Sequence, residues 1–168
     1  MNKLTNLLVL LALAAVAALG ANMGSVDTYS NTTATSTIYA DTTLTDITGV
    51  AVDLDGYRGC LIVAEVGPSE ATLATDLKIE LEVEESDASG SGFTDVADNQ
   101  LLGYVAGTND GCFGVINGAD DDSTTYYCSY IGNKRYVRVV VNCIGVIDGL
   151  TPVSATVIRS EPDYGPVH

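Results

Sequence analysis

The sequence predicts an all-β fold, an antiparallel β-sandwich or jelly-roll-like domain with an apolar N-terminal segment. After residue 21 no window shows a convincing 3.6-residue apolar period, so amphipathic helices are not expected. Glycine or proline interrupts the chain roughly every ten residues, and about eight short strand-like stretches lie between these breaks. We therefore divide the chain into an apolar segment (residues 1–21), a Ser/Thr-rich extended linker or edge strand (22–48) and the sandwich domain (49–168).

The first 21 residues have the layout of a secretory signal peptide, with Lys3, an unbroken apolar run from Leu7 to Leu19, and small residues around Gly20. Cleavage after Gly20 fits this pattern. The run is short for a membrane span, and a membrane contact is expected only if residues 4–21 are retained as an anchor. The third alternative is a retained arm that packs on a neighbouring subunit. The sequence leaves these alternatives open.

The next elements are expected to be extended. Half of the twenty residues from Thr28 to Ile47 are Ser or Thr, whose hydroxyls compete for backbone hydrogen bonds and whose β-branched Thr disfavours helix. A strand from Gly49 to Leu54 is followed by the turn dipeptide Asp55-Gly56. The apolar run from Cys60 to Val66 is typical of a central strand.

Strict alternation of apolar and charged residues marks the stretch from Lys78 to Glu84. Because successive side chains of a strand point to opposite faces, this pattern predicts a half-buried antiparallel strand. The buried face would carry Ile79, Leu81 and Val83, and the other face Lys78, Glu80, Glu82 and Glu84.

Four more strands are expected in the second half of the chain. Leu101–Ala106 and Cys112–Ile116 are short, and Thr124–Ile131 with Lys134–Cys143 forms the clearest hairpin, turning at Gly132-Asn133. The last strand spans Pro152 to Arg159. The inward residues of the last two strands are predicted to be Val137, Val139, Val141, Val153, Ala155 and Val157.

The net charge of the chain limits the classes of molecule that it can bind. Seven Lys and Arg against 22 Asp and Glu give a net charge of −15, which repels nucleic acid. Three of the basic residues, Lys134, Arg135 and Arg138, lie close together and are expected to pair with the acidic face of the Lys78–Glu84 strand, within one chain or between subunits. Asp53, Asp55 and the run Asp120–Asp122 fit no EF-hand loop, and we interpret them as solvated acidic loops.

The cysteines do not form a disulfide framework or a zinc or redox C-x-x-C pair. Cys60 and Cys143 lie in apolar runs and are interpreted as free thiols of the core. Cys112 and Cys128 flank a polar loop and would bridge it in an oxidising compartment. The sequence does not decide between their free and bridged states.

No catalytic signature is found. The single histidine is His168, at a chain end where a general base is poorly held. There is no G-x-S-x-G, Walker-type loop or H-E-x-x-H motif. A carbohydrate-active enzyme would need two facing carboxylates among stacking aromatics, and the chain has no Trp and two Phe. We therefore expect no enzyme and assign no catalytic, cofactor-binding or metal-binding residue.

Three blocks carry a resemblance to a known group of proteins. They are Asp55–Gly67 (DGYRGCLIVAEVG), Leu81–Asp87 (LEVEESD) leading into Gly92–Val96 (GFTDV), and Tyr130–Val139 (YIGNKRYVRV). In this order, before a terminal strand such as Pro152–Arg159, they resemble small virion proteins of tailed bacteriophages. The match covers roughly residues 53–162, and the last block is its most specific part. The apolar stretch before residue 21 departs from the short arm of that group.

The resemblance implies a non-enzymatic phage virion protein that decorates or stabilises the capsid at the surface of the head. Its implied partners are further copies of itself, for example in a trimer, and the major capsid protein. The alternative is a secreted or surface-attached bacterial β-sandwich that binds carbohydrate or protein after removal of residues 1–20. A capsid protein and an adhesin can share all these sequence features.

Overall fold

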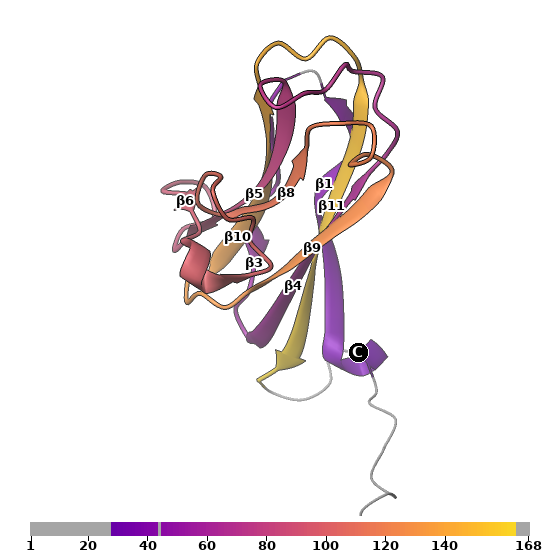
Figure 1. Cartoon of the computed structure of the whole chain (residues 1–168). Helices are drawn as coiled ribbons and strands as arrows, with labels where there is room; N and C mark the ends of the chain where they lie inside the picture. Colours follow the sequence, from indigo (N-terminus) through magenta and orange to yellow (C-terminus); the bar gives the residue numbers. More distant parts are fainter. Residues whose placement is uncertain (1–27, 44, 164–168) are drawn as a thin grey trace, which may run out of the picture.

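The computed structural model describes residues 28–43 and 45–163. Two antiparallel sheets pack face to face and enclose one apolar core (Figure 1). The predicted all-β antiparallel sandwich is confirmed. The expected apolar segment 1–21 and residues 22–27 of the linker lie outside the described residues, as does His168.

The elements of the described chain are short strands with two brief helical turns. They are α2 (Thr28–Asn31), β1 (Thr32–Thr43), β2 (Ile47–Thr48), β3 (Val52–Asp53), β4 (Tyr57–Val66), β5 (Lys78–Ser86), β6 (Thr94–Asp95), the 3-10 turn η1 (Asp98–Gln100), β7 (Leu101–Leu102), β8 (Cys112–Ile116), β9 (Thr124–Tyr130), β10 (Tyr136–Ile144) and β11 (Thr151–Pro162).

The first sheet has five strands in the order β1-β11-β4-β9-β7. Its long members β1, β11 and β4 extend together toward one end of the sandwich (Figure 1). The Ser/Thr-rich stretch forms β1, which pairs with β11 at the edge of this sheet, with irregular register between Ser36 and Asp41. There Thr37 of β1 bonds across to the other layer, because its hydroxyl donates to the Val50 carbonyl between β2 and β3 and accepts the Val139 N–H of β10.

The second sheet has six strands and is built around β10 and β5. β10 pairs with β5 along nine residues and with the short strands β2 and β3 on its other side. β5 also pairs with β8 and β6. The predicted strand Leu101–Ala106 is shortened to β7, which belongs to the other sheet.

The core lies between the sheets and is mainly aliphatic. The inward residues predicted for β10 and β11 are buried, as are Ile79, Leu81 and Val83 of β5. The largest fully buried side chains are Ile62, Ile79, Leu81, Leu101, Ile116, Val83, Val96, Val137, Val139, Val141, Val153 and Val157. Burial of such side chains is the main term that stabilises the fold.

The predicted hairpin of Thr124–Ile131 with Lys134–Cys143 is wrong. β9 pairs with β4 and β7 in the five-stranded sheet, whereas β10 pairs with β5 in the six-stranded sheet. The connection at Gly132-Asn133 therefore crosses from one layer to the other. The turn residues indicate that the chain reverses, but they do not specify which strand each arm pairs with.

The prediction that the charged side of the Lys78–Glu84 strand faces solvent is also wrong in part. Glu80 and Glu82 are 2% and 3% exposed. They face outward from the core, as the alternation predicts, but β10 and β8 flank them and the segment before β8 brings the Asn109 amide onto them. Alternation therefore gave the correct side and the wrong solvent exposure.

All four cysteines are free thiols, and Cys60, Cys112 and Cys128 are buried. Cys112 lies on β8 and Cys128 on β9, in different sheets, so the bridge considered for these two is not formed. Burial raises the pKa of the Cys60 thiol to about 12 and raises that of Cys128 further from its ordinary value. Thiols in such surroundings are unreactive.

Within the described residues, none of the helices is long and apolar enough to span a membrane.

Candidate interaction surfaces

The outer face of the five-stranded sheet carries uncharged side chains across all five strands. The register aligns Ala34, Ile158, Leu61, Ser129 and Leu102 in one row across the sheet. The next row consists of Ser36, Thr156, Val63 and Tyr127. We call these nine residues the open face.

Strand alternation explains why the open face is exposed. In β4 the inward residues Cys60, Ile62 and Ala64 are buried, and Leu61 and Val63 between them are not. Tyr127 of β9 is 69% exposed and Leu102 of β7 is 58% exposed. Apolar residues on a solvent-facing strand side of this extent mark an interaction surface more often than scattered single residues do.

A shallow groove adjoins the open face at one end. It has a volume of about 420 Å³ and lies between β1, β11 and β4, where Ala40, Pro152 and Ser154 line it with Glu65 and Asp41. These two carboxylates form the charged border of the face. Thr125 of β9 donates a hydrogen bond of 3.1 Å to Glu65.

The opposite outer face, on the six-stranded sheet, carries a row of carboxylates along β5. The Lys78 ammonium lies 2.6 Å from Glu80, which holds the pKa of Lys78 above its usual range. The amide of Asn109 donates to Glu80 and Glu82 at 3.3 and 3.2 Å, and the amide of Asn142 also donates to Glu82. We call Glu80, Glu82 and Glu84 the carboxylate row.

Glu82 is the unusual member of the carboxylate row. Within the described part of the chain it has no ion-pair partner, because Lys78 pairs with Glu80 and Arg138 with Glu84. Burial raises the pKa of Glu82, and the two amide donors oppose that shift. Burial and the nearby charges of Glu84 and Asp110 likewise raise the pKa of Asp95.

The basic cluster pairs within the chain. Arg138 lies 2.5 Å from Glu84 and stacks 4.1 Å from the centre of the Phe93 ring. The expected pairing with the acidic β5 face is therefore seen for Arg138. Lys134 pairs instead with Asp87, just beyond β5, at 2.5 Å.

Arg135 binds Asp53 through two hydrogen bonds of 3.0 and 2.8 Å. This contact lowers the pKa of Asp53 from its ordinary value. Asp55 also lies near this guanidinium, at 3.5 Å.

The block Tyr130–Val139 joins the two sheets. The Tyr130 hydroxyl donates to Glu85 of β5 at 2.5 Å and accepts the Lys134 N–H at 2.9 Å. A side chain at Gly132 would clash with the Tyr130 ring, at 2.4 Å, so only glycine allows this close approach. The most specific block of the resemblance thus forms the crossover between layers.

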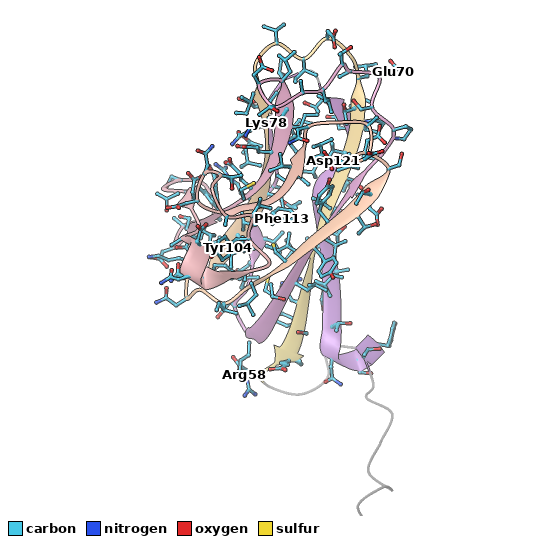
Figure 2. The ribbon with its side chains drawn as sticks, in the orientation of Figure 1. Arg58, Glu70, Lys78, Tyr104, Phe113 and Asp121 are labelled. Atoms are coloured by element: carbon cyan, nitrogen blue, oxygen red, sulfur yellow. The ribbon has the colours of Figure 1, made fainter. Side chains whose placement is uncertain are left out.

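A polar cavity of about 500 Å³ lies beside this crossover, lined by Tyr57, Arg58, Lys134 and Arg135 among others. It is at the end of the sandwich opposite Lys78 and Glu70 (Figure 2, which labels Arg58 there). Each of its three cations has a carboxylate within 3.0 Å, including Asp163 beside Arg58 at 2.9 Å. The cavity therefore offers no unpaired positive charge to an anion.

Two aspartates of the acidic loops accept hydrogen bonds from backbone N–H groups. Asp121 accepts the Asn117 N–H at 3.2 Å, and Asp122 accepts the Ser69 N–H at 2.7 Å. Among the described residues no group of three or more His, Cys, Asp or Glu side chains is arranged to hold a metal ion. The two Asp residues act here as caps of the loops around β8 and β9.

No protein-family model and no curated protein matches the chain. Solved structures with a similar fold include the SPBc2 prophage-derived protein YomS, at 15% identity and a TM-score of 0.42, over 76% of this chain and 93% of that one. Two infectious bursal disease virus structures, the VP2 subviral particle and the Gx strain, match 80% of this chain and 33% of theirs. Their identities are 12% and 15%, and their TM-scores 0.35 and 0.34.

These neighbours are prophage-derived and viral proteins. At such low identities and TM-scores the likenesses carry no argument about function.

The sequence did not reveal the open face. The run Cys60–Val66 predicts a central strand, and β4 does lie between β11 and β9. A continuous apolar run suggests burial on both sides, but only one side of β4 meets the core. The sequence feature that could have revealed it is the Ser, Thr and Tyr content of the neighbouring strand β9, which is typical of a strand side that the core does not cover.

Proposed function

We propose that the chain is a non-enzymatic structural protein of a bacteriophage virion, which decorates or stabilises the head as an oligomer in contact with the major capsid protein. The observation that carries this proposal is the open face, an uncharged sheet surface on an otherwise strongly acidic molecule. A decorating protein requires a rigid sandwich and a surface that packs on other subunits.

The resemblance blocks support the phage part of this proposal. In the block Tyr130–Val139, the Tyr130 hydroxyl of β9 bonds to Glu85 of β5 and so ties the two sheets together. Arg135 and Arg138 of the same block form ion pairs with residues of the six-stranded sheet. A bond of this kind between the two layers suits a subunit with a structural role. The proposed role involves no reacting group.

The test is to find the chain in particles. Virions from the source culture would be purified on a density gradient, and the intact mass of the chain measured in the particle fraction. A chain found at a fixed ratio to the major capsid protein, and located on the head by labelled antibody, supports the proposal. A chain that lacks about its first twenty residues and occurs only free in the medium overturns it and supports a secreted binding domain.

A further inference from the structure

The outer surface of the five-stranded sheet is large enough for a subunit contact. With neighbouring strands about 4.8 Å apart and about 3.3 Å per residue, its five strands present roughly 700 Å² to the outside. The nine residues of the open face cover roughly 300 Å² of this surface. A standard interface buries about 800 Å² on each partner, so the open face can form the centre of one such interface, with the adjoining groove and its charged border at the rim.

Charge selects the kind of partner that fits. Each copy has 22 acidic against 7 basic residues, so two copies repel at most relative orientations. On the open face the contact would bury no Asp, Glu, Lys or Arg side chain, which avoids the cost of desolvating a carboxylate. The outer face of the other sheet has the opposite character, because the carboxylate row and Arg138 occupy it.

We infer that a second copy of this chain docks on the open face, with the two five-stranded sheets packed face to face across a two-fold axis. The inference deepens the oligomer part of the proposed function and rests on it only for its biological setting. In a two-fold contact the same patch meets itself, and an uncharged patch is self-compatible where an acidic one is not.

The side chains of the open face suit sheet packing. Facing sheets lie about 10 Å apart and interdigitate their side chains. In one row of the face, the larger residues Ile158, Leu61 and Leu102 lie beside the small residues Ala34 and Ser129, so the surface is uneven. Large residues of one copy can therefore fill the spaces above the small residues of the other.

Salt dependence separates this contact from a charge-driven one. If the cations at the Arg58 end exchanged their own partners for the acidic face of another copy, salt would weaken the association. Contact through the open face brings two acidic molecules together without an attractive charge pair, so salt that screens their repulsion would strengthen it. The two modes of contact therefore predict opposite changes of the dissociation constant with salt concentration.

The test is sedimentation equilibrium of the full chain and of two exposed apolar-to-acidic variants at several salt concentrations. Tyr127→Glu puts a carboxylate on the open face. Val146→Glu makes a comparable change at an 84% exposed residue outside it, between β10 and β11. We expect the wild type and Val146→Glu to dimerise equally, with tighter association at higher salt, and Tyr127→Glu to raise the dissociation constant at least about tenfold.

Leu102→Glu, at another exposed position of the open face, repeats the test, and circular dichroism checks that each variant is folded. Equal association of wild type and both open-face variants overturns the inference, and so does association that salt weakens. A wild type that stays monomeric also overturns it. Monomers in virions refute the dimer and the oligomer part of the proposed function but leave the virion role standing, whereas a dimer absent from virions refutes the virion role alone.

Discussion

The two outer faces of this sandwich differ in how their polar and charged groups are used. On the six-stranded sheet, buried carboxylates are bound to amides and cations of the same chain. On the five-stranded sheet, the open face has no Asp, Glu, Lys or Arg side chain and leaves Tyr127 and Leu102 largely in solvent. The first face is completed by the chain itself, so its residues should matter for folding. The second should matter for contacts with other molecules.

The largest effect on stability is expected from Asn142→Ala. This change removes the amide that donates to Glu82 and leaves a buried carboxylate oxygen without that donor. We expect the free energy of unfolding to fall by about 2 kcal/mol, measured by denaturant titration. Ser129→Ala, a polar half-buried strand residue of the open face, is the matched control and should stay within about 0.5 kcal/mol of wild type. Equal losses in both variants would remove the distinction between the faces.

A smaller loss is expected from Arg138→Met. Arg138 pairs with Glu84 in a partly buried position and stacks on Phe93, so its replacement should cost about 1 kcal/mol. Lys134→Met breaks the more exposed pair with Asp87 and should change stability less than Arg138→Met does. Thermal or chemical denaturation of the two variants measures the difference in their stability. If Lys134→Met is the more damaging, partial burial does not set the strength of these ion pairs.

The same face explains what the sequence could and could not predict. Period-two patterns gave the core sides of β5, β10 and β11 correctly, because side-chain direction in a strand is a local property. The burial of Glu80 and Glu82 depends on Asn109 and Asn142, which are 29 and 60 residues away from their partners. These contacts come from residues distant in the sequence, so the alternating pattern of β5 cannot predict them.

The crossover at Gly132 shows the same limit. Turn chemistry predicts a reversal after Tyr130, and the chain does reverse there. The pairing of β9 with β4 and of β10 with β5 is decided by which sheet buries each apolar side. The open face was missed for a related reason, since a continuous apolar run does not say whether a partner covers both of its sides.

A pH-dependent effect is expected at Glu82. Burial raises its pKa above the ordinary 4.5, so the folded state binds this proton more tightly than the unfolded state. The group therefore adds stability at low pH, and this contribution is lost as the pH rises through the folded-state pKa. Glu82→Gln removes the titration, and Asn109, which is exposed, can turn its amide to accept a hydrogen bond from the new side chain.

Relative to wild type, the stability of Glu82→Gln should accordingly increase between about pH 4 and about pH 7.5. Denaturant titrations at both pH values measure this difference. Glu65→Gln, at the exposed border of the open face, is the control for removing one carboxylate at the surface. If the stability of Glu82→Gln relative to wild type decreases as the pH rises, Glu82 is stabilised as a charged group.

The smallest effect on folding is expected from Val63→Thr at the centre of the open face. The two side chains have the same shape and both favour strands, and the outer side of β4 does not meet the core. The unfolding free energy at low protein concentration should therefore stay within about 0.5 kcal/mol of wild type. Val83→Thr is the matched control, because Val83 is fully buried on the inner side of β5 and a hydroxyl placed there lacks a partner. If Val63→Thr is as destabilising as Val83→Thr, the open face is part of the folding core. If it leaves folding unchanged but weakens self-association, the apolar side chains of this face act between molecules.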